Sequence, residues 1–471
     1  MKLKELLKIV NIDFIDDNVE IKGITCNSKE VKKDYLFIAI KGNVHDGNEY
    51  IDEVLKNKAS YVISDSISGD KVLKIKNIKE IKAKLFYYFY GYPQNKLKII
   101  GITGTNGKTS IAYILYDLLN KLGSKTMYIG TLGVIDGKYN RYIDNTTPDA
   151  DILAEEFYKA VKRKTKYVIM EVSSHSLSFN RVECIDFDGA IYTNLTHEHL
   201  DYHITMANYL LAKQKLFNSL KEDKFAIINY DDKYHFEMEK YCKAKLIHYG
   251  LEKNENRISN ISRGLDGISF DIGEYTNIKS SLLGVVNVYN LSAAFLCAKE
   301  LGFNEEKIIE NIKIIETISG RLEKVYDDNY CVILDYAHTP DAMEKVLVEI
   351  KPLVTNRLIV LFGCGGNRDK SKRPIMGEIA TSYADVVYIT SDNPRFEPPL
   401  EIINDILKGC KNEKKIVIEE NREIALRKAL AEIECGDILM VLGKGHEEYQ
   451  IIGDEHIVCS DKKLIYKWLQ M

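Results

Sequence analysis

The stretch Ile100-Gly-Ile-Thr-Gly-Thr-Asn-Gly-Lys-Thr-Ser110 decides the fold of the chain around it. An apolar run over residues 97–102 ends at glycines, and a helical pattern begins at residue 111. A strand, a glycine-rich turn and a helix in this order present backbone N–H groups and a helix N-terminus to a phosphate. In such a loop Lys108 reaches the β- and γ-phosphates, and the Thr109 hydroxyl holds Mg²⁺. The sequence therefore predicts a nucleotide site, and a plain glycine turn before a helix is the alternative.

The loop departs from the usual phosphate-binding pattern at one position. That pattern places glycine five residues before Gly107, where this chain has Ile102, with Gly101 one place earlier. We still expect the loop to bind ATP through seven consecutive residues: Gly104, Thr105, Asn106, Gly107, Lys108, Thr109 and Ser110. The loop alone does not indicate which reaction follows.

The amino-acid composition limits the classes of function that the chain can have. A chain of 471 residues is too long for one core and predicts about two to four domains. The formal net charge of −4 gives no basic field for nucleic acid or an anionic membrane, and no apolar run approaches the ~20 residues of a membrane span. Nine cysteines contain no Cys-x-x-Cys pair. Several, such as Cys297, Cys331 and Cys459, have apolar neighbours, which predicts reduced, buried thiols in a cytoplasmic protein.

Hydrophobic patterning predicts an α/β fold with three domains. Residues 1–96 are predicted to form a small α/β domain, with strands near 19–24, 35–40 and 59–64. Residues 97–321 read as a central ATP-binding domain with a mostly parallel sheet. Its continuous apolar runs at 125–131, 167–172, 189–194 and 225–230 are typical of parallel strands buried on both faces. A hairpin near 264–278 and a helix near 288–301 follow. Residues 322–471 read as a doubly wound, Rossmann-like domain with strands near 331–336, 358–366, 386–391 and 438–443.

Polar residues of the middle segment fall at the ends of predicted strands, where a nucleotide on the loop can meet them. Glu171 ends one strand at the position of a second Mg²⁺ ligand, although a carboxylate that caps the next turn is the alternative. The stretch Thr196-His-Glu-His-Leu-Asp-Tyr-His203 makes zinc conceivable, but its spacing fits no zinc motif. We prefer one histidine on Mg²⁺. Asn145-Thr-Thr-Pro-Asp149 offers donors for an anionic or amide-rich substrate, though Thr-Pro turns are common.

Lys213 lies in the helical pattern of residues 209–217. From these residues alone a solvated surface lysine is the favoured interpretation.

In the last segment, two arginines follow neighbouring strands. Arg395 ends Asp392-Asn-Pro-Arg395, and Arg368 lies in Gly363-Cys-Gly-Gly-Asn-Arg-Asp369, so both are expected in one crevice at the strand ends. Guanidinium groups bind carboxylates through two hydrogen bonds. The stretch 442–450 adds acids that suit an amino group. Together these groups predict an amino-acid pocket, and surface salt bridges are the alternative for each alone.

The order of these motifs resembles the Mur ligase family. The matching stretches are Thr103–Thr109, Glu171–His175, His199–His203, Ala212-Lys213, Gly320-Arg321, Asp335–Pro340 and Gly443–Glu447. Asp392-Asn-Pro-Arg395 is similar to members that add meso-diaminopimelate. The resemblance runs from Asn27 to Gln450, nearly the whole chain.

The resemblance implies a cytoplasmic, monomeric ligase of peptidoglycan precursor synthesis that uses ATP and Mg²⁺. Such a ligase adds meso-diaminopimelate to UDP-MurNAc-L-Ala-D-Glu through an acyl phosphate, with no nucleic-acid partner. Addition of L-lysine, another Mur step or a folylpolyglutamate-type ligase are alternatives within the class. A module that uses ATP to change shape without ligation is the alternative from another class.

The resemblance also implies roles for single residues. Lys108, Lys213, His199 and Glu171 are then catalytic, and Thr109, Glu171, His199 and Lys213 hold the metal, with Lys213 carbamylated by CO₂. That role replaces the surface interpretation of Lys213. Beyond the loop, ATP contacts fall on Asn290, Arg321 and Asp335. Contacts to UDP-MurNAc-dipeptide fall on Cys26, Ser28, Asn43, Val44, His45, Asn145, Thr146, Thr147, Ser173 and Arg181. Contacts to diaminopimelate fall on Arg368, Asp392, Asn393, Pro394, Arg395, Gly443 and Glu447.

Two positions depart from the family pattern. Phe179 stands where some relatives have a glutamine that reaches the substrate, and Pro398 stands where an aspartate often follows Glu397.

Overall fold

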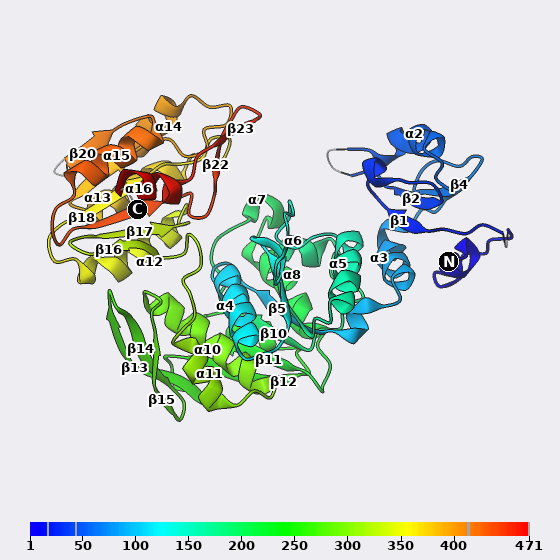
Figure 1. Cartoon of the computed structure of the whole chain (residues 1–471), viewed down its shortest axis with the longest axis horizontal. Coiled ribbons are helices and arrows are strands. Elements are labelled where there is room, and N and C mark those ends of the chain that lie inside the picture. Colours follow the sequence, from blue (N-terminus) through cyan, green and yellow to red (C-terminus); the bar gives the residue numbers. More distant parts are fainter. Residues whose placement is uncertain (17, 43–44, 412–414, 470–471) are drawn as a thin grey trace. The chain divides into compact units, whose positions relative to one another are not determined.

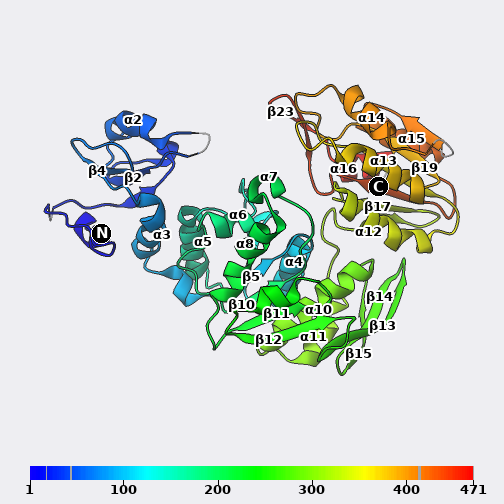
Figure 2. The same ribbon diagram turned by 180° about the vertical axis from the view of Figure 1, so that it is seen from behind.

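Four short parallel strands in the order β1-β2-β3-β4 form the first sheet of the computed structural model, which describes all residues except 17, 43–44, 412–414 and 470–471. The strands are β1 (Gly23–Thr25), β2 (Tyr35–Ala39), β3 (Tyr61–Ser64) and β4 (Val72–Lys74). Alternate residues point to opposite faces, so Phe37 packs with α2 (Ile51–Lys56). Ile38 packs with α1 (Leu3–Lys8) and α3 (Ile78–Phe89) on the other face (Figure 2). The predicted α/β character of this segment is confirmed.

Backbone contacts divide the chain into two compact units. The first contains residues 1–255 and 293–304, and the second contains residues 256–292 and 305–471. The first sheet and the sheet around the glycine-rich loop both belong to the first unit. The boundaries expected at 96/97 and 321/322 stay predictions.

The second sheet of the first unit places β5 (Lys98–Thr103) at its centre. Its order is β12-β11-β10-β5-β9-β6-β7-β8 (Figure 1). The pairs from β12 to β6 are parallel, as predicted, while β7 and β8 run antiparallel. The other strands are β6 (Thr126–Gly130), β7 (Gly133–Asp136), β8 (Tyr139–Arg141), β9 (Tyr167–Glu171), β10 (Gly189–Tyr192), β11 (Phe225–Asn229) and β12 (Lys245–Gly250). Its helices are α4 (Lys108–Lys121), α5 (Ala150–Lys162), α6 (Ser174–Ser178), α7 (Leu200–His203), α8 (Met206–Asn218) and α9 (His235–Glu239).

The register of this sheet brings the polar strand ends together. Ile102 of β5 pairs with Glu171 of β9, and Thr103 of β5 pairs with Tyr192 of β10. The carboxyl ends of the three strands therefore lie at one edge, where ligands bind in open parallel sheets.

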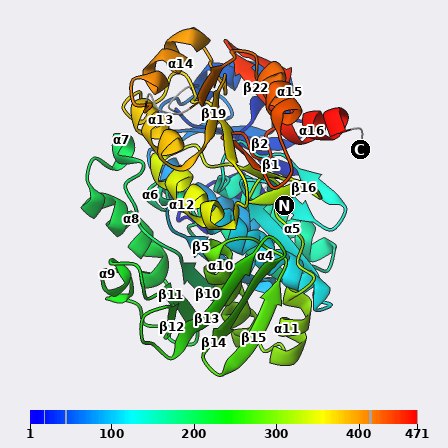
Figure 3. The same ribbon diagram turned by 90° about the vertical axis from the view of Figure 1, so that its left-hand side faces the viewer.

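The second unit begins with antiparallel strands. They are β13 (Asn256–Gly264), β14 (Gly267–Ile272) and β15 (Tyr275–Ser280), with α11 (Glu305–Ile312) against β15 (Figure 3). Helix α10 spans Val285–Glu300 and contributes residues to both units. The predicted hairpin and the following helix are both confirmed.

The last large sheet has the order β16-β17-β21-β18-β19-β20 and is parallel except for β16. One face packs on α12, α13 and α14, and the other packs on α15 and α16. A separate hairpin, β22 with β23, precedes α16. The strands are β16 (Glu323–Asp327), β17 (Cys331–Asp335), β18 (Leu358–Phe362), β19 (Val386–Ile389), β20 (Lys415–Ile418), β21 (Ile438–Leu442), β22 (Tyr449–Ile452) and β23 (Glu455–Val458). The helices are α12 (Pro340–Ile350), α13 (Lys372–Tyr383), α14 (Pro399–Leu407), α15 (Arg422–Glu432) and α16 (Asp461–Leu469). The doubly wound prediction is confirmed.

The sequence predicts reduced, buried cysteines and no membrane-spanning segment. All nine cysteines are free; Cys297 and Cys331 are buried as expected, but Cys459 is only half-buried. Among the residues that the structure describes, no helix is long and apolar enough to cross a membrane.

A buried ion pair joins α15 to α16. Arg422 donates Nε and Nη2 to the two carboxylate oxygens of Asp461 at 2.9 and 2.7 Å, and its Nη2 also donates to the Leu442 carbonyl at the end of β21. Both side chains are 1% exposed. Removing one partner would leave a buried guanidinium without its counter-charge.

We predict that Asp461→Asn lowers the free energy of unfolding of the second unit by about 3 kcal/mol, because breaking a buried pair strands a charge. Lys467→Ala is the matched control, since Lys467 pairs with Glu423 between the same two helices at the surface and is expected to change stability by less than about 1 kcal/mol. Chemical denaturation measures both variants. Equal effects would contradict the assignment of the buried pair.

Candidate active site

The glycine-rich loop has a backbone that only glycine accepts at its first position. Gly104 has φ of 151°, and a Cβ there would collide with the Thr193 hydroxyl. Gly107 has φ of 86° and directly precedes α4, whose first residue is Lys108. The predicted strand, loop and helix are confirmed, and the helix begins three residues earlier than its apolar pattern indicated.

Residues after β10 hold the loop in place. The Thr105 and Asn106 N–H groups donate to the Asn194 backbone carbonyl (2.8 Å) and side-chain oxygen (2.9 Å). The Asn106 carbonyl accepts from the Thr193 hydroxyl (2.6 Å) and the Asn194 amide (3.2 Å). The loop is therefore fixed from its neighbouring strand before any ligand binds.

Two lysines donate to one carbonyl of this loop. Lys108 Nζ lies 2.8 Å from the Gly104 oxygen and 2.6 Å from the Thr105 oxygen. Lys213 Nζ, from α8, lies 2.8 Å from the same Gly104 oxygen and above the Tyr209 ring. Lys213 is only 1% exposed, so the surface interpretation from its neighbours in sequence is wrong. The helix turns this lysine inward because Tyr209, Ala212 and Leu216 share its buried face.

The environment of Lys213 disfavours its charged form. Burial lowers the pKa of its ammonium group well below the usual value, the charge of Lys108 lowers it further, and Glu198 opposes the shift. A lowered pKa favours the neutral, nucleophilic amine, which is the form of lysine that takes part in covalent chemistry.

Glu171 is completely buried at the end of β9 and faces the start of α4. Its Oε2 accepts from the Thr109 hydroxyl at 2.9 Å, and its Oε1 accepts from the Tyr128 hydroxyl at 2.6 Å and the Thr131 N–H at 2.8 Å. The structure thus brings Thr109 and Glu171 into contact, and their role as Mg²⁺ ligands stays a prediction. A hydroxyl and a carboxylate this close are oxygen donors of the kind that Mg²⁺ prefers.

Residues predicted to contact the dipeptide continue from this group. The Thr147 hydroxyl donates to the Glu171 backbone oxygen at 2.9 Å and accepts from the Ser173 N–H at 3.0 Å. Arg181 donates to the Thr147 carbonyl at 3.0 Å and lies 3.5 Å from Asp149. The structure therefore joins Thr147, Ser173 and Arg181 to the backbone of Glu171, the residue whose carboxylate contacts Thr109.

Cys26 directly follows β1 of the first sheet and is close enough to Asp149 to feel its charge. It is half-buried, and burial together with Asp151 raises the pKa of its thiol well above the usual value, while Lys82 opposes the shift. Lys82 in turn lies 3.4 Å from Asp149, the acid beside Arg181.

Other predicted dipeptide contacts lie further out. Ser28 begins a short 3-10 helix, and exposed His45 precedes another. Asn145 is exposed in the loop before α5, and the Thr146 hydroxyl lies 3.3 Å from that of Thr131. Asn43 and Val44 lie outside the described residues.

The histidines form an aromatic cluster. His199 has φ of 56° directly before α7, and its ring meets His175 edge-on with centroids 5.0 Å apart. His203 is buried and lies 2.9 Å from the Ser174 hydroxyl. Among the described residues, no three His, Cys, Asp or Glu side chains are grouped for a metal, so the zinc alternative gains no support.

The remaining predicted ATP contacts belong to the second unit. Asn290 is buried in α10 and donates to Asn287 at 2.9 Å. Asp335 accepts the Leu322 and Ala337 N–H groups at 2.7 and 2.8 Å; burial raises the pKa of its carboxyl group, and Arg321 opposes the shift. The Arg321 guanidinium lies 4.8 Å from the centroid of the Tyr336 ring.

The predicted amino-acid contacts converge around Lys444. Its Nζ donates to Asn393 Oδ1 at 3.2 Å and to Glu447 Oε2 at 3.1 Å, and Asn393 Nδ2 donates to the same Glu447 oxygen at 2.9 Å. Lys444 is fully buried. Gly443 has φ of 105°, and a Cβ there would lie 2.7 Å from Asp392 Oδ2. Asn393, Glu447, Gly443 and Asp392 are thus neighbours, as the strand-end argument predicted.

Arg368 and Arg395 also come together. A Cβ built on Gly365 would lie 3.0 Å from Arg395 Nη1 and 3.7 Å from Arg368 Cγ. Burial lowers the pKa of the Arg395 guanidinium, and the charge of Arg368 lowers it further. Two like charges held in this way favour an anionic ligand. The two arginines are therefore neighbours, and their shared crevice stays a prediction.

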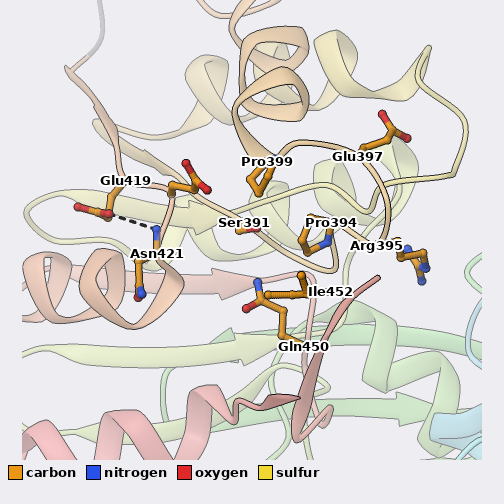
Figure 4. A pocket seen from close by; sticks show the side chains of 10 residues that line it. Ser391, Pro394, Arg395, Glu397, Pro399, Glu419, Asn421, Gln450 and Ile452 are labelled. Atoms are coloured by element: carbon orange, nitrogen blue, oxygen red, sulfur yellow. Dashed lines mark hydrogen bonds between the residues drawn. The ribbon is translucent and has the colours of Figure 1, made fainter. Parts of the chain in front are cut away.

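A cavity of about 420 Å³ adjoins Arg395 (Figure 4). Pro394, Arg395 and Glu397 line it from the loop after β19, while Glu419 and Asn421 line it from the opposite side and Gln450 lies between them.

Comparison with known proteins places this geometry in a family. Residues 102–298 match the Mur ligase middle domain, residues 320–445 the Mur ligase glutamate ligase domain, and residues 20–84 the Mur ligase family catalytic domain. The chain is 40% identical to UDP-N-acetylmuramoyl-L-alanyl-D-glutamate–2,6-diaminopimelate ligase of Fusobacterium nucleatum subsp. nucleatum, over 98% of this chain and 95% of that protein. The chain belongs to the Mur ligase family. The resemblance inferred from the motifs is confirmed.

Other members of the family match over similar lengths. The 2,6-diaminopimelate ligase of Caldanaerobacter subterraneus subsp. tengcongensis is 40% identical over 99% of this chain and 98% of that protein. A solved structure of a UDP-N-acetylmuramoyl-L-alanyl-D-glutamate–2,6-diaminopimelate ligase has a TM-score of 0.73 and 30% identity, and covers 100% of this chain and 99% of that chain. Folylpolyglutamate synthase of Mycobacterium tuberculosis, at 16% identity and a TM-score of 0.64 over 77% of this chain and 92% of that chain, shares the fold alone. The three-domain α/β Mur ligase fold is thereby established.

Several residues of the site were missed from the sequence. Thr131 and Asn194 end predicted strands and carried the same signal as Glu171, but were not singled out. Lys444 lay inside a quoted motif without an assigned role. No pattern in the sequence singles out Arg373 as part of the site.

We predict that Gly104→Ala weakens binding of a non-hydrolysable ATP analogue by at least about tenfold, because the new methyl group meets Thr193 and forces the loop to move. Isothermal titration calorimetry measures the affinity.

Gly123→Ala is the control. Gly123 follows α4 at its other end with φ of 82° and has no atom within 4 Å of a built Cβ. That variant is expected to keep its affinity within about twofold while losing about 1 kcal/mol of stability. Wild-type affinity in Gly104→Ala would contradict the assignment of the loop.

Proposed function

We propose that this chain is an ATP-dependent ligase of peptidoglycan precursor synthesis that joins meso-diaminopimelate to UDP-MurNAc-L-Ala-D-Glu, acting in the cytoplasm. The observation that carries the proposal is the similarity over nearly the full length to 2,6-diaminopimelate ligases. The fixed glycine-rich loop and the paired arginines support it, because they suit a nucleotide and a substrate with an additional carboxylate.

The first half-reaction activates the carboxylate of D-Glu. A carboxylate oxygen forms a bond to the γ-phosphorus of ATP, the bond from that phosphorus to the β-phosphate oxygen breaks, and ADP leaves. The charge spreads over the phosphoryl oxygens, so positioned cations and N–H groups stabilise it. We assign this role to Lys108 and the N–H groups of the loop, while Arg181, Thr147 and Ser173 orient the dipeptide.

The second half-reaction forms the amide. The amine nitrogen, after losing a proton, bonds to the acyl carbon, the bond from carbon to the phosphate oxygen breaks, and inorganic phosphate leaves. We assign Asn393 and Glu447 to the amino-acid ligand's ammonium group and Arg368 and Arg395 to its distal carboxylate.

Thr109, Glu171, His199 and Lys213 are the residues that we assign to Mg²⁺. When bound, the metal neutralises charge on the phosphate oxygens. The 2.9 Å contact between Thr109 and Glu171 supports these two residues as oxygen donors. A neutral Lys213 amine can add to CO₂ with loss of one proton, and the product is an anionic carbamate that supplies a further oxygen donor.

Discrimination between diaminopimelate and lysine rests on one carboxylate. With lysine bound, the half-buried Arg395 would lack the distal carboxylate as its partner, and the loss of a partner costs several kcal/mol in buried sites. A site built for a polar group rejects analogues that lack it more strongly than a hydrophobic pocket rejects a missing methylene. Diaminopimelate is therefore the preferred substrate in our proposal.

A ligation assay with the muramoyl dipeptide, offered diaminopimelate and lysine side by side, tests the function. We expect phosphate release and tripeptide formation with diaminopimelate. Arg395→Ala is expected to raise the KM for diaminopimelate by about a hundredfold and to leave the KM for ATP within about twofold. Parallel loss toward both substrates would indicate that Arg395 is structural, and release of phosphate without any amino acid would refute ligation.

We predict that Lys213→Ala lowers kcat by about a hundredfold or more, because the carbamate oxygen that we assign to Mg²⁺ is lost. Short-chain carboxylic acids are expected to restore part of the activity by occupying the vacated position. Lys215→Ala is the control, since Lys215 lies on the same helix and donates to the Leu177 carbonyl instead. Full activity of Lys213→Ala would refute the carbamate assignment.

A further inference from the structure

The two loops that carry Arg368 and Arg395 are joined directly to each other. They are residues 363–371, between β18 and α13, and residues 390–398, between β19 and α14. The Gly366 N–H donates to the Asn393 carbonyl at 2.9 Å, and the Phe396 N–H donates to Asn367 Oδ1 at 3.1 Å. Arg395 Nη1 donates to the Gly366 carbonyl at 2.9 Å. Gly366 has no room for a Cβ, because the Pro394 carbonyl occupies that space.

A buried arginine, Arg373, fixes the joined loops to α13. Its side chain is 0% exposed and donates Nη1 and Nη2 to the two oxygens of Glu397 at 3.0 and 3.1 Å. Nη2 also lies 3.4 Å from the Gly365 carbonyl, and Nη1 lies 3.0 Å from Asp405 on α14. A guanidinium bound at both Nη atoms has one orientation. Because Arg373 lies on α13, its two hydrogen bonds hold Glu397 at a fixed position relative to that helix.

Glu397 links the second loop back to the first. Its carboxylate accepts the Asn367 N–H and lies 3.1 Å from Lys370, so it holds both ends of the segment that contains Arg368. Burial raises the pKa of this carboxyl group, but the hydrogen bonds from Asn367, Lys370 and Arg373 outweigh burial and lower it. Glu397 is therefore a charged acceptor shared by two loops and a helix.

The joined loops hold two positive charges together against their repulsion. The charge of Arg368 is one of the causes that lower the pKa of Arg395, after burial. Without a rigid frame, two such side chains would separate until a ligand arrives, and that ligand would then have to order them. The backbone contacts and the pair between Glu397 and Arg373 provide the frame in advance.

We propose that Glu397 and Arg373 are positioning residues that set the spacing of Arg368 and Arg395, and thereby the preference for an amino acid with a distal carboxylate. The inference rests on the proposed function, because it concerns that same pocket. Neither residue is assigned to substrate contact: Arg373 is completely buried, and both oxygens of Glu397 are occupied by the frame.

Steady-state kinetics of Glu397→Gln test the proposal. The glutamine keeps an oxygen for Asn367 but loses the charge that binds Arg373. We expect the KM for diaminopimelate to rise by about tenfold or more, because displaced binding groups lose their alignment with the ligand. We expect kcat at saturating diaminopimelate and the KM for ATP to stay within about twofold of wild type. The ratio of kcat/KM for diaminopimelate to that for lysine is expected to fall.

Asp405→Asn is the matched control. Asp405 binds the same Nη1 atom of Arg373 at 3.0 Å, and its other oxygen accepts from Lys408, directly after α14. It is expected to leave the diaminopimelate-to-lysine ratio unchanged. Arg373→Lys is a second variant in case Glu397→Gln does not fold: it keeps the charge, replaces the fork with one ammonium, and is expected to change KM in the same direction.

The outcomes separate the inference from the proposed function. Wild-type enzyme that does not ligate diaminopimelate overturns the proposed function and the inference with it. Wild-type ligation with an unchanged KM and unchanged preference in both Glu397→Gln and Arg373→Lys overturns the inference alone. An equal rise in the KM values for diaminopimelate and ATP, or an equal effect of Asp405→Asn, also overturns it, because each would indicate general loss of structure.

Discussion

The carbonyl of Gly104 is the point on which the first unit depends. It accepts hydrogen bonds from Lys108, at the start of α4, and from Lys213, in α8. The same glycine has no room for a side chain beside Thr193. Three segments of the chain are therefore fixed at one peptide unit, and they bring the ammonium groups of Lys108 and Lys213 together. The cost of that arrangement is reduced when one lysine gives up its proton, which is the state that addition of CO₂ requires.

The second unit also holds two like charges close together, but it does so through different contacts. Arg368 and Arg395 are two like charges that are held together by loop-to-loop hydrogen bonds and by the ion pair of Glu397 with Arg373. In both units hydrogen bonds within the protein position the groups that would meet a ligand. Such preorganisation means that the ordering cost is met on folding instead of on binding.

The strands and the positions of their polar ends could be predicted from the sequence, because continuous apolar runs such as 167–170 and 189–192 are distinctive of buried parallel strands. Membership of the family also followed from motif order. The burial of Lys213 could not be predicted from its helix, since whether a lysine faces solvent depends on what packs against that face. Arg373 and Lys444 were missed for the same reason: their partners, Glu397 and Asn393, are distant in sequence and come together only through the sheet.

Ligation through an acyl phosphate is the central claim, and transfer of oxygen isotope tests it most directly. The muramoyl dipeptide would carry ¹⁸O in the γ-carboxylate of D-Glu, and the phosphate released during ligation with diaminopimelate would be examined by mass spectrometry. The account predicts one ¹⁸O atom in the phosphate for each tripeptide formed, because the carboxylate oxygen leaves with the phosphoryl group. Phosphate free of ¹⁸O, or released without tripeptide, would contradict it.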